Sequence, residues 1–353
     1  MQPVPLTADR VKTIADIARI AGVSKATVSR ALNDSTLVST ETRERVRAIA
    51  QQHGFEINAT ARSLSRQETN VIALATYPYE PFGPDEQPPG AVPADKLPDT
   101  FVLEVMSGLA AGLHARDYDM LVIQIDSNDT GWISRYLDSG RVDGFVLMAA
   151  NCTVKHLEAL EARGAPFVVW GLDSTSHAYS TVSGDSYAGG RIATQHLLDG
   201  GRRRIAFIGG PDMEQESQDR YRGYAMALRS AYVPVDESLV TYGWYSSESA
   251  RMRMRELIAH HSDIDAVFAC SDVMAIAAIE ELRAAGRSVP GDVAVVGYDD
   301  VALAAHANPP LTTVRQPGPL AGRLLADSLI QQLRTGAVGH VSIPAELVIR
   351  ESA

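Results

Sequence analysis

From Val71 onward, short apolar runs alternate with helical patterns, and this alternation restricts the fold more than any other feature of the chain. The runs include VIALATY, VDGFVLMAA, PFVVWGL, RRIAFIGG and DVAVVGYDD, and most of them end in Gly, Asp or Ser. Between them, segments such as VLEVMSGLAAGLHARD and VMAIAAIEELRAAG carry apolar residues at helical spacing. Strand–helix alternation of this length predicts parallel sheets joined by right-handed crossovers. The stretches on either side of Gly200 are each long enough for one open α/β subdomain.

Three helical patterns come before this alternation, and the first two form a pair. Residues 13–22 have the sequence TIADIARIAG, with apolar residues at helical spacing and a closing glycine. After a Gly-Val turn, Ser24 can cap a second helix. A third pattern, STETRERVRAIAQQHGF, covers residues 39–55. Two short helices joined by such a turn are typical of a helix-turn-helix.

The second of these helices, in VSKATVSRALN, has two different faces. At about 100° per residue, Val28, Ala31 and Leu32 share one arc that can pack on the first helix. The opposite arc carries long basic side chains flanked by small ones, namely Lys25, Ala26, Ser29 and Arg30. Small neighbours permit close approach to DNA. The pattern favours a DNA-reading helix, although an ordinary core helix would share it.

Charge is unevenly distributed along the chain. The whole chain has a formal net charge of −11 at pH 7, which by itself argues against nucleic acid as a partner. Residues 1–70, however, contain ten Lys or Arg and seven Asp or Glu, whereas the remainder contains 22 basic and 36 acidic residues. A mildly basic N-terminal part on an acidic body fits DNA binding through that part. A solvated helical bundle would fit the same charges.

Two segments depart from these patterns. NATARSLSRQ, residues 58–67, can form a short helix that is capped by Asn58 and has Leu64 as its only large apolar residue. Such a helix is marginal in water, so this stretch taken alone predicts a linker. Residues 77–100 are rich in proline and acidic residues. We expect them to form an irregular loop beside a strand end, or an insert without function.

The chain offers little for covalent or metal chemistry. Cys152 and Cys270 lie far apart without a partner at ligand spacing, and His260 with His261 lies in a polar segment typical of a solvated pair. No nucleophile elbow, phosphate loop, HExxH motif or dinucleotide fingerprint occurs. We therefore expect no enzyme, no cofactor and no metal. The polar N-terminus and the lack of a long apolar stretch predict a cytoplasmic protein without a membrane partner.

Polar residues follow the apolar runs, at positions that parallel sheets bring to one edge. They are Asp126, Asp185, Arg220, Ser271, Asp272, Asp299 and Asp300. Aromatic rings that could face a ligand are Trp170, Trp244, Tyr245 and Tyr298. This set suits a polyhydroxylated molecule, because each sugar hydroxyl both donates and accepts hydrogen bonds. Each residue taken alone also fits a structural role, and Asp272 or Asp300 could cap the following helix.

In these motifs the chain resembles the lactose-repressor (LacI/GalR) family of bacterial transcription regulators. The resemblance covers VKTIADIARIAGVSKATVSRALNDSTLVSTETRERVRAIAQQHGFEINATARSLS and, later, DSYAGGRIATQHLLDGGRRRIAFIGGP, DRYRGYAMAL and PPLTTVRQP. It implies an all-α helix-turn-helix DNA-binding head with a hinge helix. It also implies an α/β core of two parallel-sheet subdomains, like that of periplasmic binding proteins. Such a protein would act as a homodimer on near-palindromic double-stranded operator DNA.

The resemblance also implies roles for particular residues. DNA contacts are implied for Thr13, Ser24, Lys25, Ala26, Thr27, Ser29, Arg30, Asn33, Asn58, Ala61 and Leu64, the last as a minor-groove wedge. Effector contacts in the cleft between the subdomains are implied for Phe101, Asp185, Arg220, Tyr245, Ser271, Asp299 and Gln316. Residues 77–100 replace the family's compact stretch after the first strand. Purine-binding relatives have arginine where this chain has Glu214, which favours a neutral mono- or disaccharide as the effector.

We therefore expect a helix-turn-helix domain at residues 10–57, a hinge at 58–69 and an effector-binding and dimerisation domain at 70–353. In the last, the first subdomain would take residues 70–197 and 318–340, and the second would take 198–314 and 341–353. The predicted function is a repressor of carbohydrate-utilisation genes whose operator affinity depends on a sugar. The alternatives are a regulator that responds to a non-sugar ligand such as a nucleobase, and a solute-binding protein.

Overall fold

The computed structural model describes residues 13–32, 35–55, 68–76, 100–125, 129–148, 153–172 and 178–353. The chain forms two compact units, a head within residues 1–69 and a body at residues 70–353. Several residues singled out above lie outside the described ones, namely Asn33, Asn58, Ala61, Leu64, Asp126, Cys152 and residues 77–99. Within the described residues, no helix is both long and apolar enough to cross a membrane.

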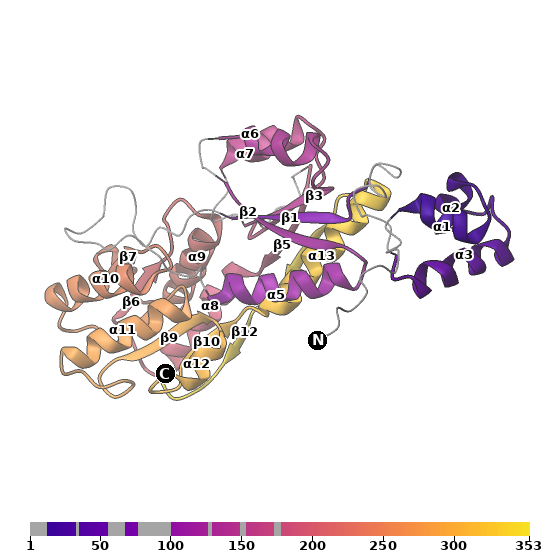
Figure 1. The fold of residues 1–353 in the computed structure, drawn as a ribbon. Helices are drawn as coiled ribbons and strands as arrows, with labels where there is room; N and C mark the ends of the chain where they lie inside the picture. Colours follow the sequence, from indigo (N-terminus) through magenta and orange to yellow (C-terminus); the bar gives the residue numbers. More distant parts are fainter. Residues whose placement is uncertain are drawn as a thin grey trace, which may run out of the picture. The chain divides into compact units, whose positions relative to one another are not determined.

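The head contains the three predicted helices (Figure 1), which are α1 (Ile14–Ala21), α2 (Lys25–Leu32) and α3 (Thr40–Gln52). Helix α1 begins with a capping box between Thr13 and Asp16 and ends at Gly22, whose φ of 66° lies in the left-handed region that glycine tolerates. The predicted inner arc of α2 is buried, and its Val28 packs with residues of α1 and α3 in one small core. The helix-turn-helix is therefore confirmed.

The first subdomain of the body is built on a six-stranded sheet in the order β11-β5-β4-β3-β1-β2. Its strands are β1 (Val71–Thr76), β2 (Asp119–Gln124), β3 (Gly144–Met148), β4 (Phe167–Trp170), β5 (Ser180–Gly184) and β11 (His340–Ile343), and all neighbouring pairs are parallel. Helices α5 (Thr100–His114) and α13 (Gly318–Thr335) cover one face (Figure 1). The other face carries α6 (Gly131–Ile133), the π-helix η1 (Ser134–Asp138) and α7 (Val154–Glu161).

The second subdomain repeats this plan with the order β12-β10-β9-β8-β6-β7. Its strands are β6 (Ile205–Gly209), β7 (Val240–Tyr242), β8 (Ala266–Ala269), β9 (Ala294–Asp299), β10 (Thr312–Arg315) and β12 (Glu346–Val348). Its helices are α8 (Ser186–Asp199), α9 (Gln215–Ser230), α10 (Ser247–His260), α11 (Asp272–Ala284) and α12 (Ala302–His306), with a short 3-10 helix, η3 (Glu237–Leu239). Only β12 breaks the parallel pairing of the described strands, since it runs antiparallel to β10. The predicted pair of parallel-sheet subdomains is thus confirmed.

The chain passes between the subdomains three times, after β5, after β10 and after β11. Two of these passages differ from the predicted boundaries at residues 197 and 340. Helix α8 packs on α9, and its Ala193 and Leu197 belong to the core of the second subdomain. Strand β11, by contrast, pairs with β5 in the first sheet. The first passage therefore comes before Ser186 and the third after Ile343, because packing and strand pairing decide to which sheet a segment belongs.

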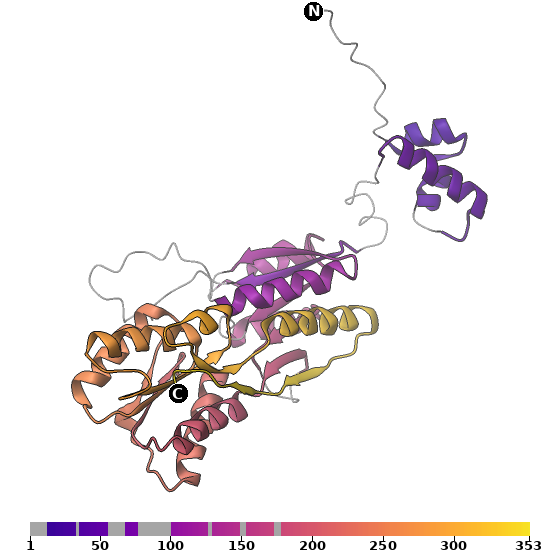
Figure 2. The same cartoon turned by 90° about the horizontal axis from the view of Figure 1, so that it is seen from below.

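Helices α5 and α13 run side by side along the first subdomain (Figure 2). They approach so closely that only glycine fits at their crossing. A Cβ atom added to Gly322 would lie 2.1 Å from the carbonyl oxygen of Val105, and one added to Gly108 would lie 2.1 Å from that of Pro319. Backbone atoms of the two helices are therefore in direct contact, and we expect the pair to move as one body.

Candidate functional site

In the head, one side of α2 is presented to solvent. Lys25, Ala26 and Arg30 are exposed, while Thr27 and Ser29 are half-buried. The N-terminus of α2 is held by Ser24, whose Oγ accepts a hydrogen bond from the Thr27 N–H at 3.0 Å. Because the opposite side of the helix is fixed in the head core, these side chains form one face of a rigid helix. Such a face can bring lysine, arginine and small side chains against base edges in a major groove.

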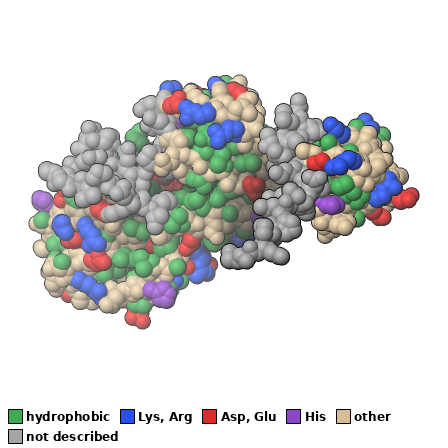
Figure 3. Space-filling view, in the orientation of Figure 1, with side chains coloured by type: hydrophobic (Ala, Val, Ile, Leu, Met, Phe, Trp, Pro, Cys, Tyr) green, Lys and Arg blue, Asp and Glu red, His purple; other side chains and the backbone are tan. Residues whose placement is uncertain are grey.

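Thr13, a predicted phosphate contact, is exposed and begins α1. Its hydroxyl donates to the Asp16 carboxylate at 2.8 Å and accepts from the Asp16 N–H at 3.2 Å. The structure thus gives Thr13 a helix-capping role. Cationic side chains lie on the head surface (Figure 3), and those exposed include Arg19, Lys25, Arg30, Arg45 and Arg47. They provide the positive charge that phosphate contacts need.

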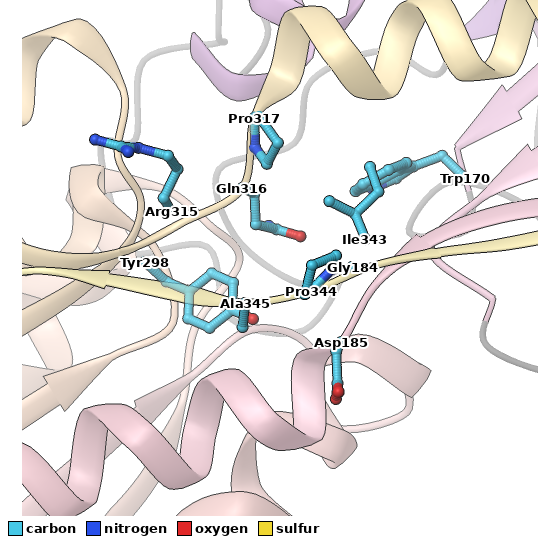
Figure 4. A pocket seen from close by; sticks show the side chains of 10 residues that line it. All are labelled: Trp170, Gly184, Asp185, Tyr298, Arg315, Gln316, Pro317, Ile343, Pro344 and Ala345. Atoms are coloured by element: carbon cyan, nitrogen blue, oxygen red, sulfur yellow. The ribbon is translucent and has the colours of Figure 1, made fainter.

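A pocket lies in the body where the chain passes between the subdomains (Figure 4). The space between its lining atoms, open solvent included, amounts to about 200 Å³. Its lining residues are Trp170, Gly184, Asp185, Tyr298, Arg315, Gln316, Pro317, Ile343, Pro344 and Ala345. Figure 4 shows Gln316 reaching into the pocket, whereas the guanidinium of Arg315 points away from it. Both subdomains therefore contribute walls to this pocket.

Gln316 and Asp299 form the polar centre of the pocket region. The Gln316 Nε2 donates to Asp299 Oδ1 at 2.9 Å, and both side chains are only 5% exposed. The two residues are also joined through the backbone, since the Gln316 N–H donates to the Asp299 carbonyl at 3.0 Å. A carboxylate and an amide in this position can exchange their mutual hydrogen bond for bonds to ligand hydroxyls.

Asp185 is a lining residue with a second role. Its Oδ1 accepts the Ala188 N–H at 2.8 Å, so it caps α8. Figure 4 shows its carboxylate pointing away from Gln316. In this structure Asp185 therefore positions the start of α8.

Arg220 lies behind Tyr298, on α9. Its Nη1 donates to the carbonyl of Cys270 at 2.7 Å, and its guanidinium carbon lies 3.9 Å from the centre of the Tyr298 ring. A buried ion pair joins Arg220 Nη2 to Glu216 Oε1 at 3.4 Å. Burial raises the pKa of Glu216, and the positive charge of Arg220 opposes this rise. The guanidinium is thus held by protein acceptors and by an aromatic face.

The remaining predicted effector residues have more varied surroundings. Tyr245, with a φ of 51°, packs its ring on Gly210, where an added Cβ would lie 2.2 Å from the ring. Ser271 caps α11 by accepting the Met274 N–H at 3.2 Å. Phe101 lies in the core of the first subdomain, with its ring centre 5.5 Å from that of Trp170. Of the seven predicted residues, Asp185 and Gln316 line the described pocket, and the others support or surround it.

Sequence reasoning missed two groups of residues at this site. The first comprises Pro317 and the segment from Ile343 to Ala345, which line the pocket because the chain changes subdomain there. No local pattern marks such crossings. The second is Glu216, which the i,i+4 spacing to Arg220 on a helix could have revealed. Among the described residues, no group of three His, Cys, Asp or Glu side chains could hold a metal ion.

Comparisons with known proteins agree with both halves of this architecture. Residues 13–58 match the family described as "Bacterial regulatory proteins, lacI family", and residues 194–353 match the "Periplasmic binding protein-like domain". The chain is 37% identical to the HTH-type transcriptional regulator CelR of Thermobifida fusca over 97% of this chain and 98% of that protein. It is 31% identical to the ribose operon repressor of Haemophilus influenzae, over 96% and 98% of the two chains.

Solved structures give the same result. A CelR–cellobiose complex superposes with a TM-score of 0.71 at 35% identity, covering 97% of this chain and 99% of that one. The Lac repressor dimer bound to operator and the anti-inducer ONPF superposes with a TM-score of 0.78 over 96% and 98% of the chains. Its identity of 24% makes it evidence for the fold alone.

Proposed function

Because this chain belongs to the LacI family of bacterial regulatory proteins, we propose that its affinity for operator DNA is controlled by a neutral sugar bound between its two subdomains. It is a sequence-specific DNA-binding transcriptional regulator of two-part design, with a helix-turn-helix head and an α/β body. The observation that carries the ligand class is the buried Gln316–Asp299 pair, whose Gln316 lines the pocket together with Trp170 and Tyr298. Amide and carboxylate groups beside aromatic faces are the usual partners of sugar hydroxyls and sugar rings.

The balance of charge around the cleft supports a neutral ligand. Asp299 and Glu216 are buried carboxyl groups, and Glu214 lies close enough to Tyr245 to raise the pKa of its phenol, although burial is the larger cause. Arg220 is the cation within this group, and its charge is already engaged by Glu216. A ligand with a negative charge would lie near several carboxyl groups, which is unfavourable in a poorly solvated site.

Cellobiose is the first compound to test, because the CelR relative has been solved with that disaccharide. A homodimer on a near-palindromic operator is the assembly we propose, with α2 of each head in a major groove. In each subunit the DNA contacts would come from Thr13, Ser24, Lys25, Ala26, Thr27, Ser29, Arg30 and Asn33, with Asn58, Ala61 and Leu64 in the hinge. Sugar binding would change the subdomain arrangement and release the operator, so the regulator acts as a repressor in the cytoplasm.

The decisive experiment combines DNA binding with ligand binding. Fluorescence anisotropy with DNA upstream of the regulated genes should give a salt-sensitive, sequence-preferring complex, weakened at saturating cellobiose. Lys25→Ala should weaken that complex by about tenfold and lower its salt dependence by roughly one charge, without affecting cellobiose binding. Leu64→Ala should weaken it further, by an amount on the order of 2–4 kcal/mol, if this residue is the minor-groove wedge.

Each part of the proposal has its own negative outcome. A complex that shows no sequence preference would remove the operator-binding function. Specific binding that cellobiose and a panel of neutral sugars leave unchanged would remove the sugar control. If hypoxanthine raises the melting temperature and none of the sugars does, the effector is a nucleobase, the alternative ligand class.

A further inference from the structure

The segment from Asp299 to Ala302 connects β9 with α12, and its backbone is strained. Asp299 has a φ of 112° and Asp300 a φ of 59°, both in the left-handed region that residues other than glycine rarely adopt. Two successive residues of this kind persist only where the surrounding structure holds them. We call Asp299–Ala302 the connecting segment. Each of its four residues is held by a different partner.

The first two residues are tied within the second subdomain and to the pocket. Asp299 accepts the Gln316 side-chain amide at 2.9 Å, as described above. Asp300 accepts from Arg315 Nε at 2.7 Å and also from Arg350. A ligand that bonds to Asp299 or Gln316 therefore acts on the beginning of the connecting segment.

The third residue, Val301, has its backbone bonded in the second subdomain and its side chain buried in the first. Its backbone N–H donates to the buried Asp272 Oδ2 at 2.9 Å, inside the second subdomain. Its side chain, only 2% exposed, belongs to the buried core of the first subdomain, the same core as Phe101 and Val105. Among the described buried residues of that core, Val301 alone comes from the second subdomain. It is an apolar contact across the boundary between the two.

The fourth residue extends this contact to α5. Burial raises the pKa of Glu104, on the first turns of that helix, and hydrogen bonding to the Ala302 backbone opposes this rise, so the two groups are neighbours across the boundary. Glu104 also touches α13, because a Cβ atom added to Gly318 would lie 2.7 Å from the Glu104 Cβ. Because α5 and α13 are in backbone contact at Gly108 and Gly322, a displacement of Glu104 would move both helices.

We propose that the connecting segment transmits occupancy of the pocket to the α5–α13 pair, with Val301 and Glu104 as the positioning residues of this coupling. This inference rests on the sugar control proposed above. A sugar hydroxyl that replaces the Gln316 amide on Asp299 releases one of the contacts that hold the strained backbone. The segment then shifts, and Val301 and Ala302 carry the shift into the first subdomain, because packed interfaces change by discrete rearrangement.

Four variants test the coupling in the full-length protein. We measure operator affinity without and with saturating cellobiose, and the ratio of the two dissociation constants is the response. Val301→Ala and Glu104→Ala should each reduce this ratio at least about threefold, whereas cellobiose affinity in the absence of DNA changes less. Glu104→Gln keeps an oxygen that can accept the Ala302 N–H, so it should restore most of the response.

Val293→Ala serves as the matched control. Val293 is also a fully buried valine, but it packs within the second subdomain. It should lower the melting temperature about as much as Val301→Ala and leave the response ratio unchanged. Equal ratios in wild type, Val301→Ala and Glu104→Ala would overturn the inference, whereas a wild type without any response would count against the sugar control instead.

A second measurement needs no sugar. Hydrogen exchange of the ligand-free protein is compared between wild type and Gln316→Ala, which removes the amide from Asp299. The Ala302 amide and the first two turns of α5 should exchange several-fold faster in the variant, and α7 should not change. Unchanged exchange in α5 would overturn the inference whatever the natural effector proves to be.

Discussion

The two subdomains of the body share a strand order but differ in what they bring to the cleft. In each, five strands follow one another along the chain, and a sixth joins after the chain has crossed over, parallel in the first sheet and antiparallel in the second. The first subdomain contributes apolar groups such as Trp170, Phe101 and Ile343. The second contributes Tyr298 to the pocket and carries buried charged groups, including Asp299, Arg220 with Glu216, and Asp272.

This difference separates two tasks that one cleft must perform. Buried charged groups recognise a ligand by specific hydrogen bonds and reject those of the wrong charge. An apolar wall holds a ring by contact area and is coupled to its own core by packing. Recognition then belongs mainly to the second subdomain, and the response belongs to the first.

The largest expected effect comes from the apolar side. Trp170→Ala empties a fully buried position against Phe101, and we expect the free energy of unfolding to fall by about 3–5 kcal/mol. Urea denaturation measures this loss. Trp244→Ala, at a half-buried position in the second subdomain, should cost clearly less. Equal losses would contradict the assignment of Trp170 to a packed wall.

The polar side should show the reverse pattern, with ligand affinity affected more than stability. Asp299→Asn removes a buried negative charge that can accept sugar hydroxyls, and it keeps an oxygen for the Gln316 amide. Loss of a charge-assisted hydrogen bond predicts roughly 10- to 100-fold weaker cellobiose binding in calorimetry, with operator affinity unchanged. Asp212→Asn, at an exposed residue, controls for net charge. Wild-type affinity in Asp299→Asn would remove this carboxylate from the binding site.

Buried charge in the second subdomain should also appear in the pH dependence of stability. Burial raises the pKa of Asp272 to about 7, against hydrogen bonds from Thr313 and Val301 that lower it. The folded state therefore binds more protons than the unfolded state between about pH 4 and 7. Asp272 thus stabilises the folded state at low pH, and this contribution is lost as the pH rises to about 7. Between about pH 4 and 7, the free energy of unfolding of Asp272→Asn should therefore fall less than that of the wild type, by an amount on the order of 1–2 kcal/mol. Urea denaturation at several pH values measures the difference. Parallel curves for wild type and variant would show that Asp272 does not titrate in this window.

The smallest effect concerns ligand charge. A phosphorylated form of the effector sugar should bind about tenfold more weakly than the neutral sugar, since Asp299 and Glu216 are buried carboxyl groups near the pocket and Arg220 is engaged by Glu216. Competition calorimetry in low and high salt measures the difference, which should shrink as salt rises. Tighter binding of the phosphorylated sugar would mean that Arg220 is available to anions despite Glu216.

Much of this architecture could be predicted from local patterns. Alternating strands and helices specify the parallel sheets, and the two arcs of α2 follow from helical periodicity, as the burial of Val28 and the exposure of Lys25 confirm. Polar residues after the strands, such as Asp299, lie near the cleft because parallel strands end at a common edge. These inferences need only neighbouring residues.

Other features depend on which distant segments pack together, and no local pattern encodes this. The predicted boundary at residue 197 places the helical pattern of α8 in the wrong subdomain, because its packing partner, α9, comes later in the sequence. Val301 is an ordinary apolar residue after an Asp-Asp pair, and its burial in the opposite subdomain appears only in the folded chain. The same holds for Glu104, whose pKa is affected by the Ala302 backbone about two hundred residues later.

The glycine contacts between α5 and α13 have a consequence for anyone who wishes to turn this protein into a biosensor. Mutant libraries that seek a new effector can vary pocket residues of the second subdomain outside the connecting segment, such as Tyr298, because that side recognises the ligand. Libraries that include Gly108 or Gly322 would mostly contain clones that fail to report any ligand, since a side chain there forces the two helices apart. Keeping those two codons constant should therefore enrich a screen for switchable variants.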